Sequence, residues 1–167
     1  TNSATLDISP FQPAVLMQDV ANSMDVLAAQ KGLKLETYLD PQLSTDISGD
    51  RLKLQQILFN LAGNAIKFTE EGTVSIRFEA VDTEQWCIIV LDTGEGIPVG
   101  VQKHIFTAFW QVDGSPTRTV NRGVGLGLSI VKQLVDLMRG EIVIDSAPGQ
   151  GSTFKITLPY DLERVLS

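Results

Sequence analysis

The chain has 167 residues, of which 43% are hydrophobic and 20% charged, and its formal net charge is −7. These proportions are enough to bury a core, so they exclude a disordered chain, and no apolar run is long enough to span a membrane. The acidic balance argues against nucleic acid as a partner, because that binding depends on basic side chains that neutralise phosphates.

The first half of the chain predicts a helix, a strand and a second helix in turn. Apolar residues recur at helical spacing over 15–31. Alternation over 33–39 is typical of a strand with one wet face, and a short edge strand is expected near Asp46. Asp50 is placed to cap a long helix that runs to about Phe68.

The second half predicts two hairpins. An alternating strand at 74–80 and an apolar strand at 86–91 are joined by a polar turn, and 141–144 and 154–158 form a second pair. Antiparallel hairpins with helices on one face indicate an α+β fold, a two-layer α/β sandwich.

A long connection and a third main helix lie between the hairpins. A short helix containing Val101 and Ile105 is expected first, followed by a polar, irregular loop over 107–123. A loop of this length inside a compact domain is usually functional. Helical spacing then predicts a helix over 124–138, which Gly140 caps.

One edge of the second helix carries side chains that could meet a nucleotide. Asn60, Asn64 and Lys67 fall within about a 60° arc, and Phe68 lies between that arc and the core. A carboxamide oxygen can ligate a hard cation, lysine can meet phosphate, and phenylalanine can stack on a base. Taken alone, these residues fit a solvated helix face with one core phenylalanine better.

Two glycine-rich segments are further candidates. Asp92 follows an apolar strand and is spaced with Gly94 and Gly96, so it could accept hydrogen bonds from a ligand amine, although an ordinary turn explains it equally well. The segment 123–127 opens a helix and could bind an anion, or could serve only close packing. It matches neither the dinucleotide fingerprint nor a P-loop.

The loop at 107–123 is the fourth candidate. Together with Phe106 before it, it carries Phe109, Arg118 and Arg122, and could form a lid over phosphates. The alternative is a disordered surface loop with two solvated arginines.

The order of these features closely resembles the N, G1, F and G2 boxes of sensor histidine kinases. The matching segments are 60–69 (NLAGNAIKFT), 92–98 (DTGEGIP), 106–109 (FTAF) and 123–128 (GVGLGL). The resemblance covers nearly the whole chain. It implies the GHKL, or Bergerat, ATP-binding fold, with a mixed sheet of about five strands and three main helices on one face.

The resemblance also implies roles for individual residues. Asn64 is expected to ligate Mg²⁺ with Asn60 beside it, and Lys67 to contact phosphate, so these three are the expected catalytic residues. Phe68 would stack on adenine, and Asp92 would bind the adenine amino group. The remaining expected nucleotide contacts are Gly94, Gly96, Ile97, Phe109, Arg118, Gly123, Gly125, Leu126, Gly127, Leu128 and Ser152.

By this resemblance, residues 1–167 form a single catalytic and ATP-binding domain, with 107–123 as its ATP lid. It would donate the γ-phosphoryl group of Mg-ATP to a histidine on a separate dimerisation domain, with a response regulator or receiver domain downstream. We expect that acceptor domain to be absent here, because the single histidine, His104, lacks the acceptor context. The isolated domain should be monomeric.

Two alternatives remain open. One is a GHKL ATPase or serine kinase, although such ATPases usually carry a glutamate where Asn60 stands, and a carboxamide is a poor base. The other is a degenerate nucleotide-binding or docking module, which the departures Arg122 and Val124 in the fourth box leave possible. The single cysteine, Cys87, fits a reducing environment, so we expect a cytoplasmic domain, either of a cytosolic protein or as the cytoplasmic part of a membrane-bound sensor.

Overall fold

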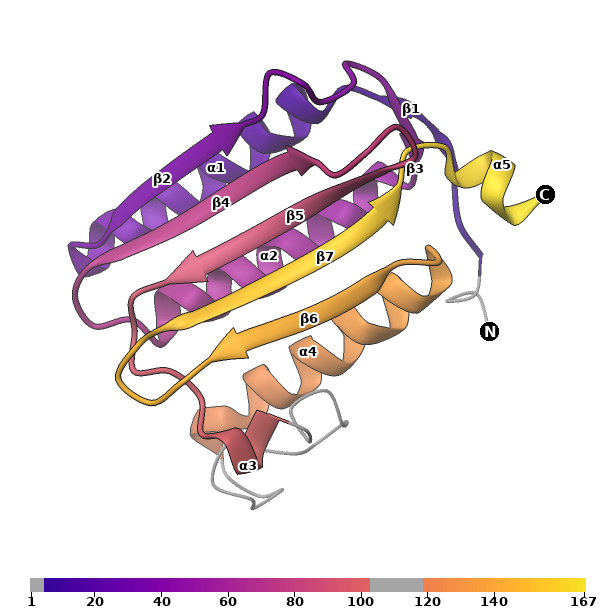
Figure 1. Ribbon diagram of the computed structural model, residues 1–167. Coiled ribbons are helices and arrows are strands. Elements are labelled where there is room, and N and C mark those ends of the chain that lie inside the picture. Colours follow the sequence, from indigo (N-terminus) through magenta and orange to yellow (C-terminus); the bar gives the residue numbers. More distant parts are fainter. Residues whose placement is uncertain (1–4, 103–118) are drawn as a thin grey trace.

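The computed structural model describes residues 5–102 and 119–167 (Figure 1). The elements are β1 (Ser9–Phe11), α1 (Pro13–Lys31), β2 (Lys34–Leu39), β3 (Ile47–Gly49), α2 (Arg51–Lys67), β4 (Thr73–Ala80), β5 (Gln85–Asp92), α3 (Val99–Gln102), α4 (Thr119–Leu137), β6 (Glu141–Ser146), β7 (Ser152–Pro159) and α5 (Leu162–Leu166).

A mixed sheet forms one layer and α1, α2 and α4 form the other (Figure 1). Its strand order among the described residues is β2-β4-β5-β7-β6, with β2 parallel to β4 and the other neighbours antiparallel. This confirms the predicted α+β sandwich and both hairpins. The short strand expected near Asp46 is β3, but it pairs with β1 in a separate ribbon.

The core lies between the two layers. On β4 the inward residues Val74, Ile76 and Phe78 are fully buried, while the residues between them are partly exposed, as the alternation predicted. On β5 the Trp86 ring packs edge-on against Phe78, with ring centroids 5.4 Å apart. Because the apolar stripe of α2 faces the sheet, the polar residues of α2 lie along the edge of that helix.

Gly32 ends α1, and Asp50 begins α2 as predicted. Gly32 follows α1 in the left-handed region, with φ 73°, where glycine carries no steric penalty. Asp50 caps α2 by accepting from the backbone N–H of Lys53, and its other oxygen accepts from the N–H of Asp7. The second contact fixes the N-terminal segment onto the start of the helix that carries the site.

The third long helix, α4, differs from the prediction at both ends. Helix α4 begins at Thr119 rather than 124, so part of the expected loop is helical; the glycines there lower helix propensity but do not end the helix. At the other end the left-handed residue is Arg139, with φ 57°, and not Gly140. A Cβ on Gly140 would lie 2.7 Å from the backbone oxygen of Thr157, so this glycine permits close packing instead.

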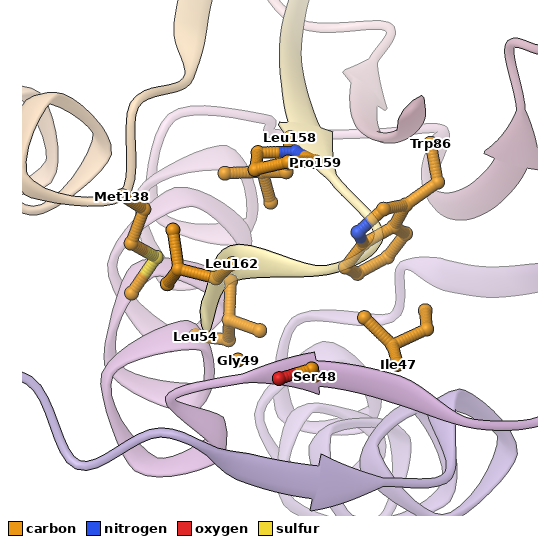
Figure 2. A pocket seen from close by; sticks show the side chains of 9 residues that line it. All are labelled: Ile47, Ser48, Gly49, Leu54, Trp86, Met138, Leu158, Pro159 and Leu162. Carbon is orange, nitrogen blue, oxygen red and sulfur yellow. The ribbon is translucent and has the colours of Figure 1, made fainter. Parts of the chain in front are cut away.

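The end of the sheet near β1, β3 and α5 contains a small cavity (Figure 2). Ile47, Trp86, Leu158 and Leu162 are among its lining residues, and the buried indole N–H of Trp86 has no partner among the described residues. Its volume of about 10 Å³ suits a single water molecule. It is therefore too small for a nucleotide. Within the described parts of the chain, no helix is both long and apolar enough to cross a membrane.

Candidate nucleotide-binding site

The two asparagines of α2 lie directly beneath Gly127 of α4. A Cβ built on Gly127 would be 3.4 Å from the side-chain oxygen of Asn60 and 3.8 Å from the side-chain nitrogen of Asn64. Any larger side chain at this position would cover the two amides. The structure thus brings three predicted site residues together at one contact between helices.

Two polar atoms at this end of α2 are buried without a partner in the described structure. They are the side-chain nitrogen of Asn64 and the hydroxyl oxygen of Thr69. Buried polar atoms are nearly always hydrogen-bonded, because leaving one unpaired costs about 1–3 kcal/mol. A polar ligand that reaches them would offset this cost, so the residues present fit a bound nucleotide.

A hard cation would find amide ligands here rather than a cage of acidic side chains. Among the described residues, no group of three or more His, Cys, Asp or Glu side chains is arranged to hold a metal. Mg²⁺ is commonly held by few protein oxygens together with waters and substrate phosphates. Asn64 and Asn60 offer such oxygens, which fits a cation that arrives with the nucleotide.

Lys67 and Phe68 extend this edge beyond the asparagines. Lys67 is exposed, Phe68 is half-buried, and the Lys67 ammonium lies 5.5 Å from the centroid of the Phe68 ring. The end of α2 therefore presents a cation and an aromatic face side by side, as the spacing predicted.

Asp92 ends β5 on the neighbouring side of the site. Burial raises the pKa of its carboxyl above the usual value, and hydrogen bonds from the backbone N–H groups of Gly94 and Ser152 partly offset this rise. One carboxylate oxygen accepts from the Gly94 N–H at 2.9 Å. The group is a half-buried acceptor with capacity for a further donor, such as an amino group.

Gly94 lies where the end of β5 packs closely against the end of α2. A Cβ at this glycine would lie 2.7 Å from the backbone oxygen of Phe68, and 3.0 Å from both a carboxylate oxygen of Asp92 and the hydroxyl oxygen of Thr69. Three oxygen atoms therefore surround the position that any other residue would fill. Gly96 has φ 79°, and a Cβ there would meet the Ala147 backbone. Both predicted glycines are required by close approach.

A chain of hydrogen bonds joins Ile97, the residue after Gly96, to the end of β6 and the start of β7. The Ser146 hydroxyl accepts from the Ile97 N–H at 2.8 Å, donates to the Gly151 carbonyl, and lies 2.9 Å from the Ser152 hydroxyl. Gln102 then donates from its side-chain amide to the carbonyl oxygens of Ile97 and Ser146. The predicted residues Ile97 and Ser152 are thus connected to each other through Ser146.

Three residues of this region were not among the predicted site residues: Thr69, Ser146 and Gln102. Thr69 directly follows Phe68, so its position in the segment 60–69 was a usable signal. Ser146 and Gln102 carry no motif, and their contacts depend on how the second hairpin folds against 92–98.

The predicted lid contacts are placed only in part. Phe109 and Arg118 lie outside the described residues. Gly123, Gly125 and Leu126 lie in α4, and Leu128 is buried in the core. Of the glycine-rich segment, Gly127 is the residue whose contact with the site is described, and the roles of the others stay predictions.

Residues 49–162 match the family model described as histidine kinase-, DNA gyrase B-, and HSP90-like ATPase. The matched segment contains both asparagines, Asp92, both glycine-rich segments and Ser152. All the predicted site residues therefore lie within it.

Two curated relatives are sensor proteins. The chain is 37% identical over 159 residues to the sensor histidine kinase RcsC of Escherichia coli strain K12, covering 94% of this chain and 16% of the relative. It is 43% identical over 157 residues to the sensor protein GacS of Pseudomonas syringae pv. syringae, covering 92% of this chain and 17% of the relative. The chain thus spans less than a fifth of either relative.

A solved structure of full-length ShkA in complex with AMPPNP has a similar fold. The TM-score is 0.83 at 36% sequence identity, and the match covers 93% of this chain and 32% of that one. The similarity therefore extends over nearly all of this chain and about a third of the larger protein.

Proposed function

Because the chain belongs to the family of histidine kinase-, DNA gyrase B-, and HSP90-like ATPases, we propose that it binds Mg-ATP and donates the γ-phosphoryl group to a histidine of a separate dimerisation domain. Its fold is that of a histidine-kinase catalytic domain. Its curated relatives are sensor proteins, one of which is named a sensor histidine kinase. The crystallised ShkA holds AMPPNP, an ATP analogue, which supports ATP as the ligand of this chain.

The observation that carries the proposal is the set of polar atoms left without partners at one end of the sheet. The Asn64 nitrogen and the Thr69 hydroxyl are buried and unpaired among the described residues, and Gly94 lets the Asp92 carboxylate, Phe68 and Thr69 approach one another closely. A base with an exocyclic amino group suits Asp92, an aromatic face suits the Phe68 ring, and phosphates suit the Lys67 ammonium.

The residues of this chain would act by binding and orientation. Asn64, with Asn60 beside it, would hold Mg²⁺, which would neutralise charge on the transferring phosphoryl group, and Lys67 would contact the phosphates. Phosphoryl transfer depends mainly on such positioning and charge stabilisation. The base for the acceptor histidine would come from the dimerisation domain, because Asn60 has no useful basicity.

The wider context is part of the same proposal. Residues 1–167 act as one catalytic domain with 107–123 as a lid, in the cytoplasmic part of a longer sensor kinase. A receiver domain or response regulator would take the phosphoryl group from the histidine. Supporting this, both curated relatives are much longer sensor proteins.

Calorimetric titration of ADP and an ATP analogue, with and without Mg²⁺, tests the nucleotide site. We expect saturable binding, weakened about 10- to 100-fold by Asp92→Asn, since hydrogen bonds to charged groups contribute about 1.5–3 kcal/mol. Asp25→Asn, an exposed substitution on α1, is the matched control and should bind as the wild type does. Equal affinity in the Asp92→Asn variant would contradict the proposed adenine pocket.

Phosphotransfer is tested by mixing the chain with a dimerisation domain from a related sensor kinase and radiolabelled ATP. Acid-labile phosphate on that domain is expected. Asn60→Glu tests the base argument against the ATPase alternative: we expect that this substitution alone creates no vigorous ATPase, and a large gain in steady-state phosphate release would contradict the argument.

A further inference from the structure

Lys31, the last residue of α1, contacts the end of α2 at which the proposed nucleotide site is built. Its ammonium donates to the backbone oxygens of Ile66 and Lys67, at 3.0 Å in each case. The same nitrogen lies 3.9 Å from the carboxylate of Glu70, whose side chain is 88% exposed. An ion pair so exposed contributes little, so the two carbonyl contacts are the important ones.

The last carbonyl groups of a helix have no partner within the helix and form the negative end of its dipole. At the end of α2, the oxygen of Ile66 also accepts from the N–H of Thr69, at 3.4 Å. The positively charged Lys31 ammonium donates a second hydrogen bond to the Ile66 oxygen and also donates to the oxygen of Lys67. It therefore stabilises the last turn of α2 and restrains the direction in which the chain leaves it.

The residues restrained in this way are those of the site. The backbone carbonyl of Lys67 accepts one of the two hydrogen bonds from Lys31, so the backbone that carries the Lys67 side chain is restrained. Phe68 follows, with its ring below the Lys67 ammonium and its oxygen beside Gly94. Within the described structure Lys67 makes no ion pair, so its ammonium stays available for phosphate.

The backbone around Lys31 is held to the same region. The N–H of Lys34 donates to the carbonyl of Gly72 at 3.0 Å, at the start of the β2-β4 pairing. The N–H of Thr73 in turn donates to the hydroxyl of Thr93. The turn after α2 is thus clamped between the end of α1 and the segment that contains Gly94.

We propose that Lys31 is a positioning residue of the nucleotide site, which holds the end of α2 so that Lys67 and Phe68 face the nucleotide. This inference rests on the proposed function and adds to it a residue that lies outside every binding motif. It also makes the end of α1 part of the site's support.

The test begins with Lys31→Met, which removes the ammonium and keeps an unbranched apolar side chain. We expect the dissociation constant of ADP to rise about tenfold, the equivalent of losing one or two modest hydrogen bonds. Lys31→Arg, which keeps a cation and donors, should restore most of the affinity. Lys34→Met is the control, because the Lys34 side chain is 72% exposed and pairs only with Glu36 among the described residues.

A double-mutant cycle with Lys67→Met separates positioning from simple stabilisation. If Lys31 acts through Lys67, Lys31→Met should raise the dissociation constant less in the Lys67→Met background than in the wild type. Fully additive losses, or a lower melting temperature with unchanged ADP affinity, would overturn the inference while leaving the proposed function intact. A wild-type chain that binds no ADP would overturn both.

Discussion

Gly127→Ala should make the free domain more stable and the nucleotide site worse. Gly127 is buried within α4, and a glycine inside a helix costs about 0.5–1 kcal/mol relative to alanine. The added methyl would lie 3.4 Å from the Asn60 oxygen and 3.8 Å from the Asn64 nitrogen, which is ordinary van der Waals contact. The free protein therefore gains helix stability without a clash.

The same methyl stands over the amides of Asn60 and Asn64, and Asn64 is the expected Mg²⁺ ligand. Keeping a ligand from one such amide should cost about 1–3 kcal/mol, the penalty for an unpaired buried polar group. We therefore expect ADP affinity in the presence of Mg²⁺ to fall about 10- to 100-fold. A stabilisation of about 1 kcal/mol should raise the melting temperature by about 2–4 °C for a chain of this size.

The assay pairs thermal unfolding without ligand with calorimetric titration of Mg-ADP. Gly63→Ala is the matched control, because Gly63 also lies inside a helix and a Cβ there meets nothing within 4 Å. It should gain similar stability and keep wild-type affinity. Undiminished affinity in Gly127→Ala would show that the contact between α2 and α4 is not part of the binding site.

Three further predictions concern Asp92, Arg139 and Ser146. Because burial raises the pKa of Asp92, its ionisation should destabilise the free fold as pH rises through the interval between the ordinary and the raised pKa. Asp92→Asn should therefore gain more stability relative to the wild type at pH 7 than at pH 3, which lies below the ordinary carboxyl pKa, in thermal unfolding; wild-type ADP affinity should fall as pH drops through the raised pKa. Arg139→Gly should raise the free energy of unfolding in urea by about 1 kcal/mol, because Arg139 occupies the left-handed region; no gain would mean that its side chain makes a compensating contact. Ser146→Ala should weaken ADP binding about threefold to tenfold by releasing the Ile97 N–H. Unchanged titration curves would show that ADP binding does not depend on the hydrogen bond between Ser146 and Ile97.

The residues predicted from the sequence were those whose role depends on local spacing. Asn60, Asn64, Lys67 and Phe68 share an edge of α2 because the helix repeat places them there once the apolar stripe faces the core. Asp92 ends a buried strand because the apolar run ends with it. The predicted start of α4 was wrong because glycines lower helix propensity without ending a helix, so the helix already begins at Thr119.

The sequence by itself determined the order of the main helices and strands, the apolar faces of the main helices and of β4, and the motif residues at their ends, because these follow from periodicities of two and 3.6 residues along the chain. Only the tertiary structure decided which of those ends meet. It placed Gly127 over the two asparagines, Gly94 against Phe68 and Thr69, and the Lys31 ammonium on the carbonyls of α2. Contacts of this kind join residues far apart in the chain, and no local pattern specifies them, because they depend on how the helices and the sheet pack together.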